Sequence, residues 1–164
     1  MKYSLFFIVC LLLVAACSQG VKKDLTTGLT TSYNGFAIEE VLLVDSADQN
    51  LKTMQVPLAS RFSVVLQGIT NYQLKDDKAF PGLSMSVTDS KGNAIINEAD
   101  LFASSEGYSA KDASVLRATV TVGSPMQSGQ TYHCKVRVFD KQKADSEIVC
   151  EVDFTVQEQL RTKV

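Results

Sequence analysis

The residues that most often carry chemistry are sparse in this chain. Its 164 residues include a single histidine, His133. A lone imidazole needs partner ligands to hold zinc or copper, and Met54, Met85 and Met126 are scattered without the spacing that such a site requires. We therefore predict no metal site, and we interpret His133 as a solvated residue on the exposed face of a strand.

The acidic residues and the hydroxyl residues give no catalytic pattern either. Asp76-Asp77 and Asp89-x-x-Gly92 could suggest calcium, but the full spacing of a calcium-binding loop is absent. No Ser-His-Asp order, nucleophile elbow or phosphate-binding loop is present. We therefore predict that the protein is not an enzyme and uses no cofactor.

The elements that would position any site are strands, because apolar residues recur at every second position. Tyr132, Cys134, Val136 and Val138 alternate with polar residues, and the pattern returns over 148–156. Such alternation predicts strands with one buried and one wet face. Further strands are expected at 36–44, 51–56, 61–66, 83–87, 94–96 and 115–122, with a tight turn over 89–93. The predicted fold class is all-β: a single antiparallel β-sandwich of about seven to eight strands over residues 35–157.

The first residues form a separate unit. Lys2 supplies a positive start, and the stretch from Leu5 to Val14 is continuously apolar. As a helix this stretch would rise only about 15–18 Å, against a hydrocarbon core of roughly 30 Å. It therefore indicates the apolar region of a signal peptide, with residues 1–16 removed.

Leu13-Val14-Ala15-Ala16-Cys17 resembles the lipobox of bacterial lipoproteins. The resemblance implies cleavage before Cys17, a diacylglycerol on its sulfur and an acyl chain on its new amine. Two or three acyl chains hold a protein stably on a membrane, whereas one does so only marginally. In such proteins an Asp after the cysteine favours the inner membrane, so Ser18 implies the outer membrane of the envelope. A simple secreted protein and an uncleaved anchor are the rival interpretations.

Cleavage would leave 148 residues and remove one lysine, giving a formal charge of −3. A mildly acidic chain without a basic stripe argues against nucleic acid as a partner. A chain of this length can form a core without staples, which predicts one domain. Residues 17–34 lack apolar periodicity and are expected to be a flexible tether carrying the lipid. Residues 158–164 are expected to be a C-terminal tail.

Pro125 to Tyr132, followed by alternating apolar residues, resembles the turn into a late strand of bacterial immunoglobulin-like domains. Tyr132-His133-Cys134 is similar to the Tyr-x-Cys of true immunoglobulin domains, whose cysteine is bridged to an early strand. This chain departs from that family because residues 61–68 contain no cysteine and the chain has no Trp. The resemblance therefore implies an immunoglobulin-like sandwich and not an antibody-type domain.

Cys134 and Cys150 fall on the same predicted face of consecutive strands, in an oxidising compartment if the chain is exported. A hairpin centred near Gln142 would place them directly opposite each other. A centre one residue later would make them diagonal and would strain a bridge. A structural disulfide and two buried thiols both fit these observations. A redox role is not expected, because no Cys-x-x-Cys pair is present.

The order of strands predicts where partners bind. Successive antiparallel strands place the connections 69–82, 97–114 and 140–146 at one end of the sandwich. The tether and the tail are expected to leave from the other end, so that these loops face away from the membrane. Tyr72, Phe80 and Tyr108 are candidate partner-binding residues, whereas Phe102 is expected to cap the core.

The resulting hypothesis is a binding or assembly module, tethered to the membrane by lipid on Cys17. It would present its distal loops to an envelope protein or a glycan. The alternative is a carrier that encloses a hydrophobic small ligand within the sandwich, and an enzyme is the third class considered.

Overall fold

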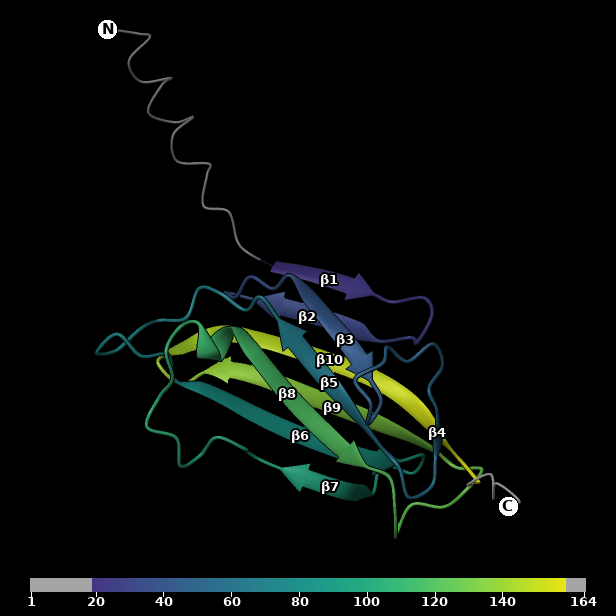
Figure 1. Ribbon diagram of the computed structural model, residues 1–164. Helices are drawn as coiled ribbons and strands as arrows, with labels where there is room; N and C mark the ends of the chain where they lie inside the picture. The colour runs from purple at the N-terminus through teal and green to yellow at the C-terminus, as the bar shows by residue number, and fades with distance from the viewer. Residues whose placement is uncertain (1–18, 159–164) are drawn as a thin grey trace, which may run out of the picture.

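The computed structural model describes residues 19–158 and is a β-sandwich (Figure 1). Within that range the chain forms ten strands and one 3₁₀ turn. They are β1 (Gln19–Lys23), β2 (Thr30–Asn34), β3 (Glu40–Val44), β4 (Gln55–Pro57), β5 (Arg61–Gln67), β6 (Pro81–Asp89), β7 (Ala94–Glu98), η1 (Asp112–Ser114), β8 (Val115–Thr121), β9 (Thr131–Asp140) and β10 (Lys143–Gln157). The predicted all-β class is confirmed.

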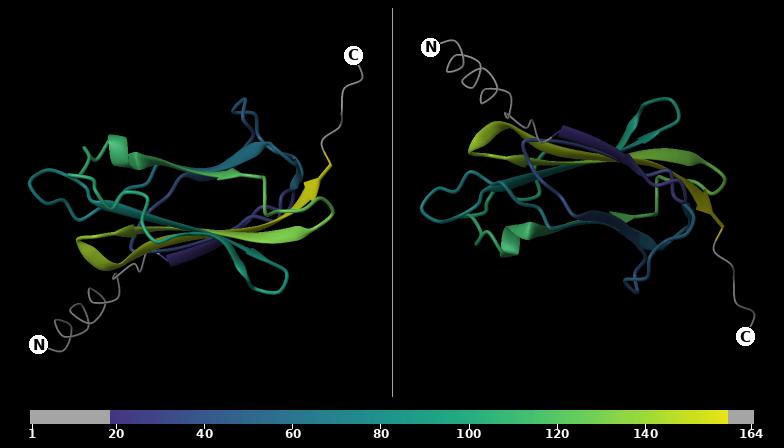
Figure 2. Two further views of the ribbon diagram at one scale, coloured as in Figure 1. Left: turned by 90° about the horizontal axis from the view of Figure 1, so that it is seen from below. Right: turned by 90° about the horizontal axis from the view of Figure 1, so that it is seen from above.

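Two sheets face each other, and Figure 2 shows them as separate layers. The larger sheet has the order β1-β2-β10-β9-β6-β7, with β4 added in parallel to the end of β10. The smaller sheet has the order β3-β5-β8. All pairs except β4 with β10 are antiparallel. Consecutive strands are therefore joined mainly by hairpins within one sheet or by connections that cross from one sheet to the other.

The core lies between the two sheets and is built by the alternation that predicted the strands. On β9 and β10 the inward residues are almost completely buried, while their neighbours in sequence are more exposed. Phe62 of the smaller sheet meets Phe154 of the larger sheet with ring centroids 5.1 Å apart. Tyr132 stacks on the other side of Phe154 at 5.7 Å. These rings join the layers and fix their spacing.

A side-chain hydrogen bond ties the turn before β9 to that strand. The backbone N–H of Gln127 donates to the hydroxyl of Tyr132 at 2.8 Å. In immunoglobulin-like sandwiches a tyrosine two residues before the cysteine of this strand makes the same kind of contact with upstream backbone. The contact supports the immunoglobulin-like resemblance, which the Tyr132-His133-Cys134 sequence had suggested.

The prediction of a flexible tether is wrong for residues 19–34, which form the β1–β2 hairpin on the edge of β10. Thr31 is only 4% exposed and faces Cys150, while Tyr33 packs partly against the core. The buried face of β2 thus uses a threonine and a tyrosine, which is why no apolar periodicity was visible. The hairpin raises the strand number from the expected seven or eight to ten among the described residues.

One end of the sandwich carries residues 68–80, 99–114 and 141–142, and we refer to it as the loop end. These connections share an end, as predicted. The expected exit of both chain ends at the opposite end is wrong. Gln19 pairs with Asn34, and Asn34 pairs with Glu147, so the described chain begins beside the loop end.

The reason for this correction lies between β3 and β4. Both strands run away from the loop end, since β3 is antiparallel to β5 and β4 is parallel to β10. The segment 45–54 therefore produces no net reversal of the chain, whereas 36–44 and 51–56 were expected to be successive antiparallel strands. The last residue of β10, Gln157, pairs with Pro57 at the far end. The two ends of the described chain thus leave from opposite ends of the sandwich (Figure 1).

Candidate functional site

The connections of the loop end are joined to one another by main-chain hydrogen bonds. Ala79 donates to the carbonyl of Tyr108 at 2.8 Å, and Tyr108 donates back to Ala79 at 2.9 Å. Lys141, in the turn between β9 and β10, donates to the carbonyl of Phe80 at 3.0 Å. Three segments that are distant in the sequence are therefore held as one surface.

Asp100 anchors this surface to the larger sheet. Its carboxylate accepts hydrogen bonds from the backbone of Leu83 at 3.0 Å and of Phe102 at 2.9 Å. Its other oxygen lies 2.7 Å from the ammonium of Lys141. Burial raises the pKa of Asp100, but the bonds from Lys141, Leu83 and Phe102 outweigh burial and bring the pKa below its usual value. The Asp100 carboxylate therefore holds the 99–114 connection against β6 and against Lys141.

Asp140 has a similar role on the other side of the loop end. It is 3% exposed and accepts hydrogen bonds from the backbone of Gln73 at 2.7 Å and of Gln142 at 2.9 Å. These bonds hold the 68–80 connection against the end of β9. The partly exposed carboxylate of Asp100 and the buried carboxylate of Asp140 are thus both engaged with backbone donors.

The structure places Tyr72 in a supporting position. Its ring lies edge-on against Phe36 with centroids 4.9 Å apart, and its hydroxyl donates to the carbonyl of Ala113 at 3.1 Å. Burial, assisted by the charge of Asp140, raises the pKa of Tyr72 well above its usual range. The hydroxyl therefore remains a donor, and the side chain joins the 68–80 connection to η1.

The other aromatic residues of the loop end pack on one another. Phe102 and Tyr108 meet edge to face at 5.7 Å, and Phe102 also contacts the core, as expected. Phe80 lies against Gly107, where an added Cβ would be 2.9 Å from its ring. Phe80 and Tyr108 keep part of their surface exposed. They can reach a partner only with the exposed part of each ring.

Two exposed leucines in the connections of this end were not predicted from the sequence. Leu74 is 48% exposed and Leu101 is 44% exposed. The backbone N–H of Leu101 donates to the carbonyl of Leu83 at 2.7 Å, while its side chain is exposed. A leucine set among polar residues, as Leu74 is, was the available signal.

Cys134 and Cys150 are free and buried, each 1% exposed. Cys134 pairs with Val152, and Cys150 pairs with Val136, so the two thiols lie diagonally on neighbouring strands. This is the register centred one residue after Gln142. Burial raises the pKa of each thiol to about 12. Both cysteines are inert core residues in this structure, and Cys17 lies outside the described residues.

The outer face of the larger sheet carries a ladder of compensated charges. His133 lies 2.7 Å from Asp153 through Nδ1, and Lys135 lies 3.0 Å from Glu151. His133 is thus half exposed on the outer face and paired with an acid. Among residues 19–158, no group of three or more His, Cys, Asp or Glu side chains is arranged to hold a metal ion.

The acidic groups considered for calcium lie elsewhere. Asp89 closes the β6–β7 turn, where its carboxylate accepts bonds from the backbone of Lys91 and Asn93 at 2.8 Å each. This confirms the turn predicted over 89–93. Asp76 and Asp77 are exposed in the 68–80 connection with positive φ angles of 50° and 58°.

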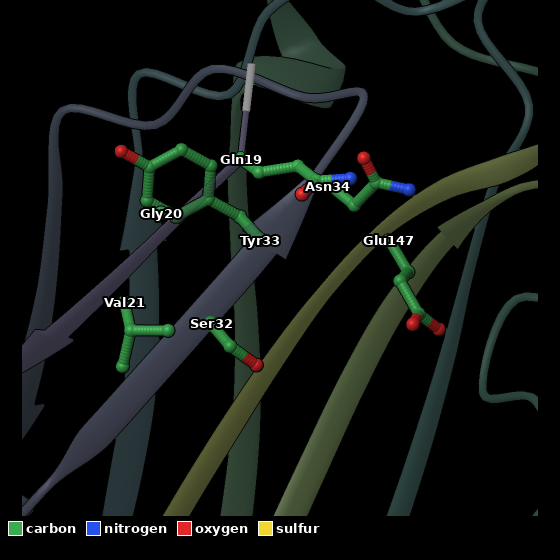
Figure 3. A pocket seen from close by; sticks show the side chains of 7 residues that line it. All are labelled: Gln19, Gly20, Val21, Ser32, Tyr33, Asn34 and Glu147. Carbon is green, nitrogen blue, oxygen red and sulfur yellow. The ribbon is translucent and has the colours of Figure 1, made fainter. Parts of the chain in front are cut away.

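A hollow of about 360 Å³ lies where β1 and β2 meet β10 (Figure 3). The ring of Tyr33 covers Gly20, and a Cβ added there would come within 2.4 Å of the ring. The amide of Asn34 donates to the carbonyl of Asp145 at 2.8 Å. The remaining lining residues are Gln19, Val21, Ser32 and Glu147. The hollow is a shallow depression beside the first strand, and its glycine is required by the tyrosine above it.

No helix in the described part of the chain is long and apolar enough to cross a membrane. Comparison of the chain with protein-family models and with curated proteins gave no match.

Proposed function

We propose that this protein is a lipid-anchored, non-enzymatic binding module of the bacterial cell envelope. The lipobox-like sequence ending at Cys17 supports the anchor, and Ser18 favours the outer membrane. The observation that carries the binding role is the loop end. Three connections are held there by main-chain bonds and by the carboxylates of Asp100 and Asp140, and their exposed side chains include Leu74 and Leu101. Rigid loops with exposed apolar groups are suited to recognition.

The chemistry of this surface favours a protein over a glycan as the partner. Sugars are usually bound on the open face of an aromatic ring, but the rings of Phe102 and Tyr108 are packed against each other. The side chains that stand free are leucines, and apolar groups of this kind fill pockets on protein partners. The polar surroundings of Leu74 and Leu101 would form the rim of such an interface.

The packing of the interior favours a binding module over a carrier of a hydrophobic ligand. Phe62 and Phe154 meet across the space between the sheets, and both are 1% exposed. Leu66 and Val120 of the smaller sheet and Val136 of the larger sheet are also completely buried. A ligand enclosed there would have to displace these side chains.

Under the proposed anchor, the loop end lies next to the membrane. Cys17 precedes Gln19 by two residues, which span at most about 7 Å when extended. Gln19 is beside the loop end, so the expected presentation of these loops away from the bilayer is replaced by a membrane-proximal one. The partner would then be a protein of the same membrane or one bound at its surface.

Photo-crosslinking in cells tests this proposal. A photoreactive residue at Leu74 or at Leu101 should give a discrete crosslinked band in the membrane fraction. The matched control is Ser128, which is exposed in the 122–130 connection at the far end of the sandwich. Crosslinks that are absent at Leu74 and Leu101, or equal at Ser128, would contradict a binding role for the loop end.

A further inference from the structure

The β1–β2 hairpin carries the two most exposed large apolar side chains of the described residues. Leu25, in the turn of the hairpin, is 91% exposed, and Val21, in β1, is 74% exposed. The other exposed large apolar residues, at three separate places, lie between 44% and 53%. Single exposed apolar residues are common, but two such residues on one short hairpin indicate a surface that a partner or a lipid layer covers.

The hairpin lies at the rim of the molecule. β1 pairs with β2 and with no other described strand, so its outer edge is open (Figure 1). A flat surface can therefore approach β1 and the following turn together.

The charges of the hairpin suit a layer of lipid headgroups. Lys22 and Lys23 are exposed on opposite faces of β1. The ammonium of Lys22 donates to the carbonyl of Glu39 at 3.5 Å and lies 5.9 Å from the centre of the Tyr33 ring, so that Lys23 is the lysine on the same face as Val21. Asp24 is the one acid of the hairpin, and its carboxylate is engaged with the backbone of Thr26 and the hydroxyl of Thr27 at 2.8 Å each. Lysines beside exposed apolar side chains can place their charge among phosphates while their stems lie lower.

The length of chain before β1 identifies the occupant. If Cys17 carries lipid, its sulfur lies at the boundary between headgroups and acyl chains. Val21 is four residues further, a reach of at most about 14 Å. The headgroup layer on each side of a bilayer is itself about 5–8 Å thick. With residues 19–34 folded as a hairpin, the domain has no long tether to lift β1 from this layer.

We propose that the β1–β2 hairpin rests on the lipid surface, with Val21 and Leu25 in the interfacial layer and Lys23 among the headgroups. This inference rests on the proposed anchor at Cys17. It places the sandwich on its β1 edge, so that the loop end faces along the membrane and toward a neighbouring protein. Glu40 is exposed in β3 and Glu39 directly before it, so acidic side chains border β1 on the side of the smaller sheet.

Depth-dependent fluorescence quenching tests the contact. The full chain, isolated from membranes, would carry one environment-sensitive fluorophore at L25C and be placed in vesicles of phosphatidylethanolamine and phosphatidylglycerol with nitroxide-labelled lipid. The matched control is N97C, exposed on β7 at the opposite edge of the same sheet. Cys134 and Cys150 are buried and should stay unlabelled. We expect quenching at residue 25 to be several-fold stronger than at residue 97.

The outcomes separate the two proposals. The intact mass of the same preparation reports acylation of Cys17. An acylated protein with equal quenching at residues 25 and 97 would overturn the hairpin contact and leave the anchor standing. A protein without acyl mass would overturn the anchor, and the hairpin contact would be overturned with it.

Discussion

Replacement of Tyr72 separates the supporting residues of the loop end from those available to a partner. The ring packs edge-on against Phe36 at 4.9 Å, and its hydroxyl bonds Ala113 at 3.1 Å. Complete loss of a fully buried aromatic ring costs about 3–5 kcal/mol. Because Tyr72 is half-buried, we expect Tyr72→Ala to lower the free energy of unfolding by about 2–3 kcal/mol. Tyr72→Phe removes only the hydrogen bond and should cost about 1 kcal/mol.

Urea denaturation followed by circular dichroism measures these changes, with Leu74→Ala as the matched control from the same connection. Leu74 is 48% exposed, so its truncation should change the free energy of unfolding by less than about 0.5 kcal/mol. In a domain of this size Tyr72→Ala should lower the Tm by about 4–12 °C. The reasoning is refuted if Tyr72→Ala is as stable as Leu74→Ala.

Three further predictions concern Asp100, the two buried cysteines and the turn at Gly35. Asp100→Ala leaves the buried N–H of Leu83 without its acceptor and should cost about 2–4 kcal/mol in urea unfolding, whereas Asp100→Asn should cost about 1 kcal/mol. Because the pKa of Asp100 is lowered on folding, its contribution is present above the unfolded value of about 3.8 and is lost as the pH falls through the lower folded value, which acid titration of the wild type against Asp100→Asn would show. Cys134 and Cys150 should react with a thiol reagent at pH 8 only after unfolding, and rapid reaction of the native protein would contradict their burial. Gly35→Ala should destabilise the fold by more than about 1 kcal/mol, because φ is +71° and the added Cβ would lie 2.4 Å from the Ser146 hydroxyl, and an unchanged Tm would count against this reading.

Strands with apolar alternation could be predicted from the sequence because one face of each is buried. β9 and β10 follow the alternation through Tyr132, Val136 and Val152, although β10 begins at Lys143, five residues before the predicted start at 148. β2 escaped prediction since its buried face uses Thr31 and Tyr33, whose polar atoms mask the period. Burial of such residues depends on the neighbouring β10, which lies more than 100 residues away in the chain.

The position of the loop end could be predicted from the sequence, whereas the arrangement of its side chains could not. The antiparallel order of strands is enough to gather the 68–80, 99–114 and 141–142 connections. Which aromatic ring faces outward depends on contacts such as Tyr72 with Ala113 and Phe80 with Gly107, which no local pattern encodes. The prediction of where the chain lies at residue 19 was wrong for a similar reason, because the pairing of β4 with β10 is a long-range contact.

The two cysteines show that a shift of one residue in strand register decides whether their thiols lie opposite each other or diagonally. The sequence allowed Cys134 and Cys150 to be opposite or diagonal, depending on where the hairpin is centred. Residues 143–147 contain an irregularity that shifts the pairing of β10 with β9, and the thiols end up diagonal. Turn residues alone did not predict this irregularity, which lies directly before the residues of β10 that pair with β2.

The anchor at Cys17 is the claim on which the orientation of the loop end and the hairpin contact both depend. Its most direct test is mass spectrometry of the N-terminal peptide of the protein purified from the membranes of its native cell. We predict a peptide that begins at Cys17 and carries two or three acyl chains, and we predict that Cys17→Ser abolishes this modification and releases the protein from the membrane. A mature chain with an unmodified Cys17, or one that still begins at Met1, would contradict the account.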